Sequence, residues 1–88
     1  MSTNAIKPDD ILSDGENFAE LNGVIVRKGS IAAFLKNIDL FENVNSNAAQ
    51  KAEALEMIKE LAPVIVVAGL HKHATFKNKI IEDILCSL

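Results

Sequence analysis

The side chains with the most chemical potential lie together in residues 71–79. His71-Lys-His-Ala-Thr-Phe-Lys-Asn-Lys79 holds both histidines of the chain and three lysines, and it contains no acid. We expect a helix to begin beside it, and a helix N-terminus offers free amide groups and the positive end of the helix dipole. Added cations and titratable imidazoles suit a phosphate or another small anion. The pattern predicts a ligand-binding site at His71, Lys72, His73 and Lys77, against the alternative of an ordinary solvated turn.

The same histidines are a weaker candidate for a metal site. Imidazole is a common ligand of zinc, nickel and copper, and Cys86 or Asp83 is available as a third donor for His71-x-His73. Both rings share a face on a strand but diverge by about 200° in a helix. No further residue has convincing ligand spacing, so we expect a surface pair, with no metal and no cofactor.

Cys86 is the only cysteine, which excludes a disulfide within the chain. We place it near the C-terminus of the last helix beside Asp83, where nothing cationic lowers the pKa of a thiol. An idle thiol in a reducing compartment is the expected state. The sequence has no Gly-rich phosphate loop, no GxSxG turn and no carboxylate pair in a shared cleft, so it does not favour an enzyme.

The composition predicts a folded protein that binds neither nucleic acid nor membrane. Hydrophobic residues make up 49% of the chain and charged residues 24%, which is typical of a globular domain. The net charge of −3 and the lack of Tyr and Trp argue against nucleic-acid binding. The first residues lack the pattern of a signal peptide, and the uncharged run 61–70 is about half of a membrane span. We therefore expect a cytoplasmic location.

The local signals predict an α+β, mostly helical fold in one domain over residues 1–88, with residues 1–7 disordered. Asn22-Gly23 favours the positive φ angles of a type I′ turn, and β-branched residues follow it, which predicts a hairpin over about 18–27. Pro8 and the acids after it predict one or two turns of helix, ended by Asp14-Gly15.

Three to four helices are expected to pack on the hairpin. Hydrophobic periodicity places them at about 30–42, 47–62, 63–70 and 75–87. Ser30, Asn47 and Thr75 are the expected N-caps. Pro63 is expected to break or kink a long helix, because proline lacks an amide and its ring clashes with the preceding turn. Residues 64–68 also suit a strand, and periodicity leaves that choice open.

Apolar residues are plentiful for a domain that buries so little surface, which favours association. One wide apolar face of the expected 47–62 helix and its continuation is the candidate interface, and it comprises Leu55, Met57, Ile58, Leu61 and Val64. Charge is uneven, with five acids and no base in residues 9–20. The sequence favours a non-enzymatic interaction or structural module, acting as a homodimer or with an unidentified protein partner. The alternative is a small anion- or nucleotide-binding sensor at residues 71–79.

Overall fold

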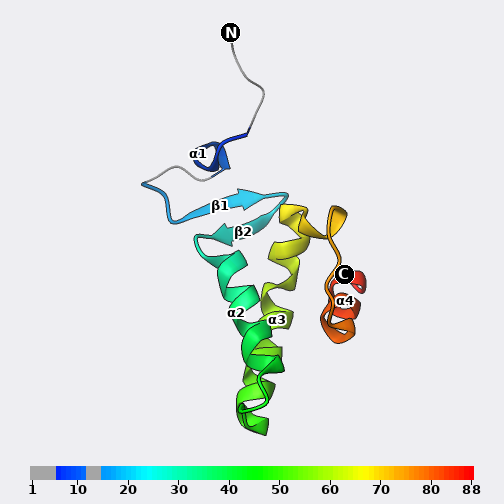
Figure 1. Ribbon diagram of the computed structural model, residues 1–88. Helices are drawn as coiled ribbons and strands as arrows, with labels where there is room; N and C mark the ends of the chain where they lie inside the picture. Colours follow the sequence, from blue (N-terminus) through cyan, green and yellow to red (C-terminus); the bar gives the residue numbers. More distant parts are fainter. Residues whose placement is uncertain (1–5, 12–14) are drawn as a thin grey trace.

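The structure is a computed structural model that describes residues 6–11 and 15–88, and it shows a β-hairpin standing on the end of a helical body (Figure 1). The elements are α1 (Pro8–Ile11), β1 (Phe18–Leu21), β2 (Val24–Arg27), α2 (Ser30–Glu42), α3 (Ala48–Ala68), the 3-10 helix η1 (Leu70–Lys72) and α4 (Lys79–Cys86). The predicted α+β, mostly helical architecture is confirmed. Within the described ranges, no helix is long and apolar enough to cross a membrane.

The hairpin forms where the sequence predicted it. Asn22 and Gly23 take φ angles of 48° and 82°, the left-handed values that a type I′ turn requires. The strands are antiparallel, with Phe18 opposite Arg27 and Leu21 opposite Val24. Side chains alternate between a half-buried face toward the helices and an exposed face. Helix α1 is also confirmed, whereas residues 1–5 of the predicted disordered stretch and Asp14 lie outside the described residues.

Helices α2 and α3 run antiparallel as one long helical hairpin (Figure 1). At the start of α3, Asn47 Oδ1 accepts a hydrogen bond from the Gln50 amide and Gln50 Oε1 accepts one from the Asn47 amide, each at 2.8 Å. This capping box confirms the predicted start. The prediction for Ser30 is wrong by one residue: Gly29 is the N-cap, and the Ser30 hydroxyl donates to the Arg27 carbonyl at 2.8 Å.

The predicted break at Pro63 is wrong, because α3 continues through it and joins the segments predicted as 47–62 and 63–70. Pro63 itself is exposed, while Ala62, Val64 and Ile65 around it are buried. Burying a Val or Ile side chain stabilises a fold by about 1.5–3 kcal/mol, and a proline inside a helix costs about 3 kcal/mol through its missing hydrogen bond and the clash of its ring. Burial of both Val64 and Ile65 therefore offsets the cost of Pro63. Residues 64–68 are helical, and the strand alternative is excluded.

Helix α4 begins at Lys79, so the predicted start at Thr75 is also wrong. Asn78 is the N-cap, and its side-chain oxygen accepts from the Ile80 amide at 2.9 Å. The segment before it is irregular because Phe76 is anchored in the protein, where its ring meets that of Phe34 edge to face at 5.6 Å. This anchor delays the helix and fixes the chain between η1 and α4.

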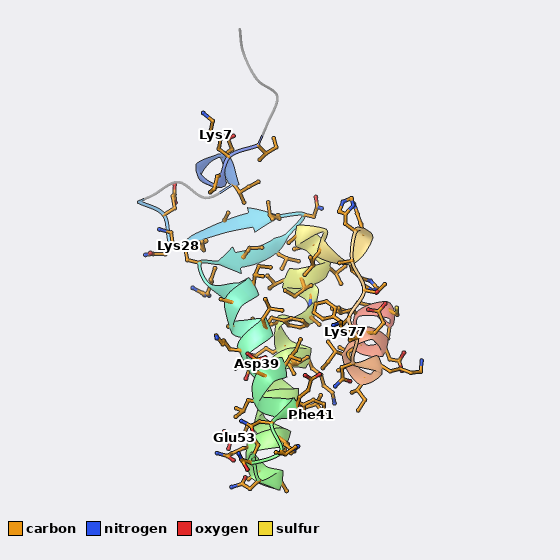
Figure 2. The ribbon with its side chains drawn as sticks, in the orientation of Figure 1. Lys7, Lys28, Asp39, Phe41, Glu53 and Lys77 are labelled. Atoms are coloured by element: carbon orange, nitrogen blue, oxygen red, sulfur yellow. The ribbon has the colours of Figure 1, made fainter. Side chains whose placement is uncertain are left out.

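The core lies between α2, α3 and α4, whose inward side chains fill the space between the three helices (Figure 2). Its buried members are Phe34, Ile38, Ile58, Ala62, Ile65, Ile81 and Leu85. Among the described residues, none before Phe34 belongs to this core cluster. The hairpin is thus attached to the helical body through β2 and α3 without sharing its core.

Candidate functional site

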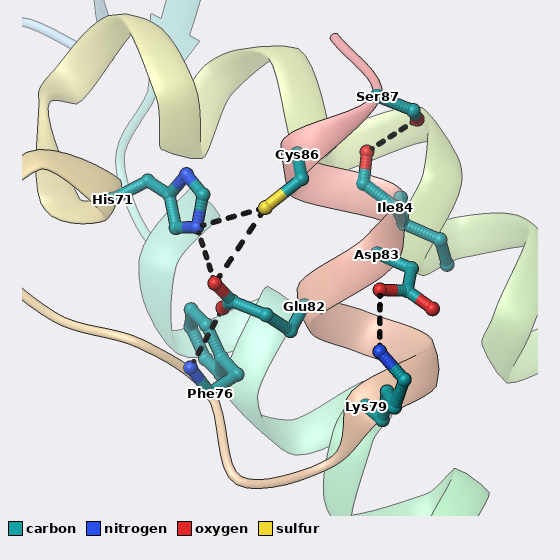
Figure 3. Close-up of polar contacts among 8 residues, drawn as sticks. All are labelled: His71, Phe76, Lys79, Glu82, Asp83, Ile84, Cys86 and Ser87. Carbon is teal, nitrogen blue, oxygen red and sulfur yellow. Dashed lines mark hydrogen bonds and ion pairs between the residues drawn. The ribbon is translucent and has the colours of Figure 1, made fainter.

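Three different metal-ligand side chains meet between η1 and α4 (Figure 3). His71 Nε2 lies 2.8 Å from Glu82 Oε2. The Cys86 sulfur lies 3.7 Å from the same imidazole nitrogen and 3.6 Å from the same carboxylate oxygen. An imidazole, a carboxylate and a thiol therefore direct one atom each toward a common point.

Two elements and one fixed connector position this cluster. Glu82 and Cys86 are four residues apart on α4, so they project from the same face of the helix. His71 belongs to η1, which follows the left-handed turn at Gly69. The Phe76 amide donates to Glu82 Oε1 at 2.9 Å, which holds the carboxylate so that its other oxygen faces His71.

The cluster is open to solvent. The side chains of His71 and Glu82 are each 22% exposed, and Cys86 is an exposed residue. A dissolved ion or small reagent can therefore reach all three donor atoms without a change of fold.

The local environment shifts the pKa of two of the three groups. The backbone N–H of Phe76, followed by the imidazole of His71, holds the pKa of Glu82 below its ordinary value. Desolvation, followed by the negative charge of Glu82, raises the pKa of the Cys86 thiol. The carboxyl group is thus ionised at neutral pH, while the free thiol keeps its proton.

This geometry does not suit a cysteine nucleophile. A Cys-His-carboxylate triad uses both imidazole nitrogens, one toward the sulfur and the other toward the carboxylate. Here a single nitrogen, Nε2 of His71, faces both Glu82 and Cys86, and the other nitrogen points away from them (Figure 3). The raised pKa of Cys86 also disfavours the reactive thiolate. Convergence of three donors on one point is instead the arrangement of a cation site.

The chain matches no protein-family model, no curated protein and no solved structure.

The four residues predicted as an anion site do not form one site. His71 turns toward α4, and His73 is exposed outside the cluster. Lys72 lines a groove beside the hairpin turn, with Asn22 among its neighbours. Lys77 lines a different groove along α2 and lies near α4 (Figure 2). Their side chains therefore do not converge on one anion.

The residue that sequence reasoning missed is Glu82. The sequence offers Cys86 or Asp83 as the third ligand of the histidine pair, and the structure places Cys86 in the cluster, whereas Asp83 is exposed and lies 3.4 Å from Lys79. The four-residue spacing of Glu82 and Cys86 was the available signal, because such residues are neighbours on a helix surface.

The predicted interface on α3 does not form one exposed face. Ile58 and Val64 are buried in the protein, and Leu61 packs against the core. Leu55 is half-buried, which leaves Met57 as the exposed large side chain of the set. Other large exposed apolar side chains are spread along the described chain. They include Ile6, Ile11, Phe18 and Ile25 in its N-terminal part, and Val44, Ile80 and Leu88 further on.

Proposed function

We propose that the protein is a non-enzymatic interaction module that acts as a homodimer, joined through the outward hairpin face, which we define as Phe18, Glu20, Ile25 and Arg27. The observation that carries this proposal is the exposure of Phe18 and Ile25, each 51%, on a hairpin outside the core. Strand alternation puts these four residues on the side turned away from the helices.

A two-stranded hairpin becomes more stable when protein also packs against its second face. Two strands alone are marginal in water and become stable by packing or by adding strands. The inner face of this hairpin rests on α3 through β2. Its outward face has two large apolar side chains at diagonal positions, because Phe18 is opposite Arg27 and Glu20 is opposite Ile25. Burying their exposed halves stabilises a dimer.

The charges of the outward hairpin face favour a second copy as the occupant. Glu20 and Arg27 occupy its other diagonal, and neither forms an ion pair with the described part of its own chain. In a twofold dimer the same patch meets itself, so Glu20 of each chain can face Arg27 of the other. The outward hairpin face is therefore complementary in charge to a second copy of itself. Its remaining two residues, Phe18 and Ile25, are apolar.

The first test is sedimentation velocity over a range of concentrations, with reduced protein and a chelator present. Interference optics are needed because the chain has no Tyr or Trp. Ile25→Thr keeps the β-branched side chain that strands prefer, and we expect it to weaken association at least about tenfold, as about 1.4 kcal/mol of lost burial would. Ile80→Thr is the matched control, because Ile80 is 52% exposed on α4.

A charge swap tests the orientation of the two copies. Glu20→Arg and Arg27→Glu are each expected to weaken the dimer, and the double variant is expected to restore it. Wild-type protein that remains monomeric at high micromolar concentration overturns the proposal. Equal losses from Ile25→Thr and Ile80→Thr overturn its location on the hairpin.

A further inference from the structure

We propose that His71, Glu82 and Cys86 form a binding site for a divalent transition-metal ion of the zinc class. This site is independent of the dimer proposed above, because its residues lie on η1 and α4 rather than on the hairpin. The proposal rests on the distances between three donor atoms, on their chemistry and on the way the carboxylate is held.

The three donor atoms outline one face of a tetrahedral site. Zinc binds thiolate sulfur at about 2.3 Å and imidazole nitrogen or carboxylate oxygen at about 2.0–2.2 Å. Tetrahedral angles then place nitrogen and sulfur about 3.6 Å apart, and sulfur and oxygen about 3.5 Å apart. The observed separations from Cys86 Sγ are 3.7 Å to His71 Nε2 and 3.6 Å to Glu82 Oε2. Two of the three edges therefore already have the length that a bound ion requires.

The third edge has to open slightly. His71 Nε2 and Glu82 Oε2 are 2.8 Å apart because they share a hydrogen bond, whereas a tetrahedral site needs about 3.3 Å. A shift of about 0.5 Å is within reach of side-chain rotation for two groups that are partly exposed. A bound ion takes the place of the shared proton between these atoms.

The donor set selects the class of ion. Thiolate and imidazole favour zinc, cobalt and related transition metals, whereas magnesium and calcium prefer oxygen ligands only. One thiolate and one carboxylate balance the charge of a divalent cation, and a neutral imidazole completes the set. A partly exposed site with three protein ligands keeps its fourth position for water or another small ligand.

The surroundings orient the ligands before an ion arrives. Glu82 Oε1 is engaged by the Phe76 amide at 2.9 Å, which leaves Oε2 for the ion. Phe76 is itself fixed by its ring contact with Phe34. Hydrogen bonds of this kind to a metal-binding carboxylate tune affinity in known metal sites.

Binding releases a proton from the thiol. The reduced thiol loses its S–H proton to solvent as the bond from sulfur to the ion forms, with no change in oxidation state. The imidazole binds through the lone pair of Nε2, so its ring proton resides on Nδ1 in the complex. Affinity is therefore expected to rise with pH, since a proton competes with the ion for Cys86.

The test is a titration of reduced full-length protein, without a histidine tag, with Co²⁺ and then Zn²⁺. We expect one Co²⁺ per chain, the near-ultraviolet band of a cobalt-thiolate bond and the visible bands of tetrahedral Co²⁺, all removed by Zn²⁺. Three substitutions are each expected to lower affinity at least about 100-fold, because each removes a ligand. They are His71→Asn, Glu82→Gln and Cys86→Ser.

Two neighbouring residues provide matched controls. His73→Asn and Asp83→Asn remove the same chemical groups two residues and one residue away, and both side chains are exposed outside the cluster. We expect them to retain wild-type affinity. Far-ultraviolet circular dichroism shows that each variant is folded, and zinc is expected to raise the melting temperature of the wild type but not of Cys86→Ser.

The proposal is overturned by the absence of a cobalt-thiolate band in the wild type, or by equal losses of affinity in the ligand variants and their neighbouring controls. Its failure is distinct from that of the dimer, because the Ile25→Thr variant is expected to bind one ion per chain with wild-type affinity.

Discussion

His71 Nε2 and Glu82 Oε2 lie 2.8 Å apart, and this contact joins two segments that are eleven residues apart in the sequence. It holds η1 against α4 across the irregular chain around Phe76. The same atoms are the ones that a cation would share with Cys86. The contact therefore contributes to the metal-free fold as well as to the proposed site.

Glu82 gives the metal-free protein a stability that depends on pH. Its pKa is held below the ordinary value of 4.5 by the Phe76 amide and then by His71. A lowered pKa in the folded state stabilises the protein above the unfolded pKa, and this contribution is lost as pH falls through the folded pKa. We expect Glu82→Gln to be less stable than the wild type at pH 7 and to approach it in acid, below about pH 4.

Urea unfolding followed by circular dichroism, with a chelator present, measures this difference at each pH. Asp83→Asn is the control, because Asp83 faces solvent and its partner Lys79 is exposed. A difference between Glu82→Gln and the wild type that is constant from neutral to acid pH would contradict the assignment.

The N-cap of α4 is expected to be Asn78 in solution as well. Its side chain accepts from the Ile80 amide and donates to Glu42 at 3.0 Å, whereas Thr75 makes no such cap. Asn78→Ala is expected to lower the free energy of unfolding by about 1 kcal/mol. Thr75→Ala is expected to change it by less than about 0.5 kcal/mol. A larger loss of unfolding free energy for Thr75→Ala than for Asn78→Ala, measured by urea unfolding, would place the N-cap at Thr75.

Local chemistry was sufficient to predict some elements of this fold. Asn22-Gly23 specifies the hairpin because few residues other than glycine and asparagine take positive φ angles. Asn47 and Gln50 specify the start of α3 through contacts three residues apart. The course of α3 past Pro63 was not predictable in this way, because it depends on the burial of Val64 and Ile65 against other helices.

The candidate site shows the same limit. The pairing of Glu82 with Cys86 follows from helix geometry and was available from spacing alone. The position of His71 beside this pair could not be predicted from spacing, because it depends on the turn at Gly69 and on the anchoring of Phe76. Sequence spacing instead suggested a pair with His73, which the structure leaves exposed.

Burial separates Ile58 from Met57, its neighbour in the predicted interface. Ile58 is fully buried in the core, whereas Met57, the preceding residue of α3, is partly exposed. Ile58→Ala is expected to lower the free energy of unfolding by about 2–5 kcal/mol. Met57→Ala is expected to lower it by less than about 1 kcal/mol. Similar losses of unfolding free energy in the two variants would mean that Met57 is also buried in solution. The interface predicted on α3 would then be favoured again.

Pro63 is expected to destabilise the helix that contains it. It has no amide to donate to the Lys59 carbonyl four residues earlier, and its exposed ring makes little compensating contact with the core. Pro63→Ala allows the missing hydrogen bond to form and places a strong helix former at this position. It also raises the conformational entropy of the unfolded chain, which opposes part of the gain. We expect a net gain of about 1–2 kcal/mol in the free energy of unfolding.

Pro8→Ala is the control for this substitution. Pro8 is the first residue of α1, where its missing amide would have no partner within the helix. We expect its replacement to change the free energy of unfolding by less than about 0.5 kcal/mol. A loss of stability in Pro63→Ala would show that the proline ring is held by contacts, and the groove that Pro63 lines with Val24 and Leu88 would then be its location.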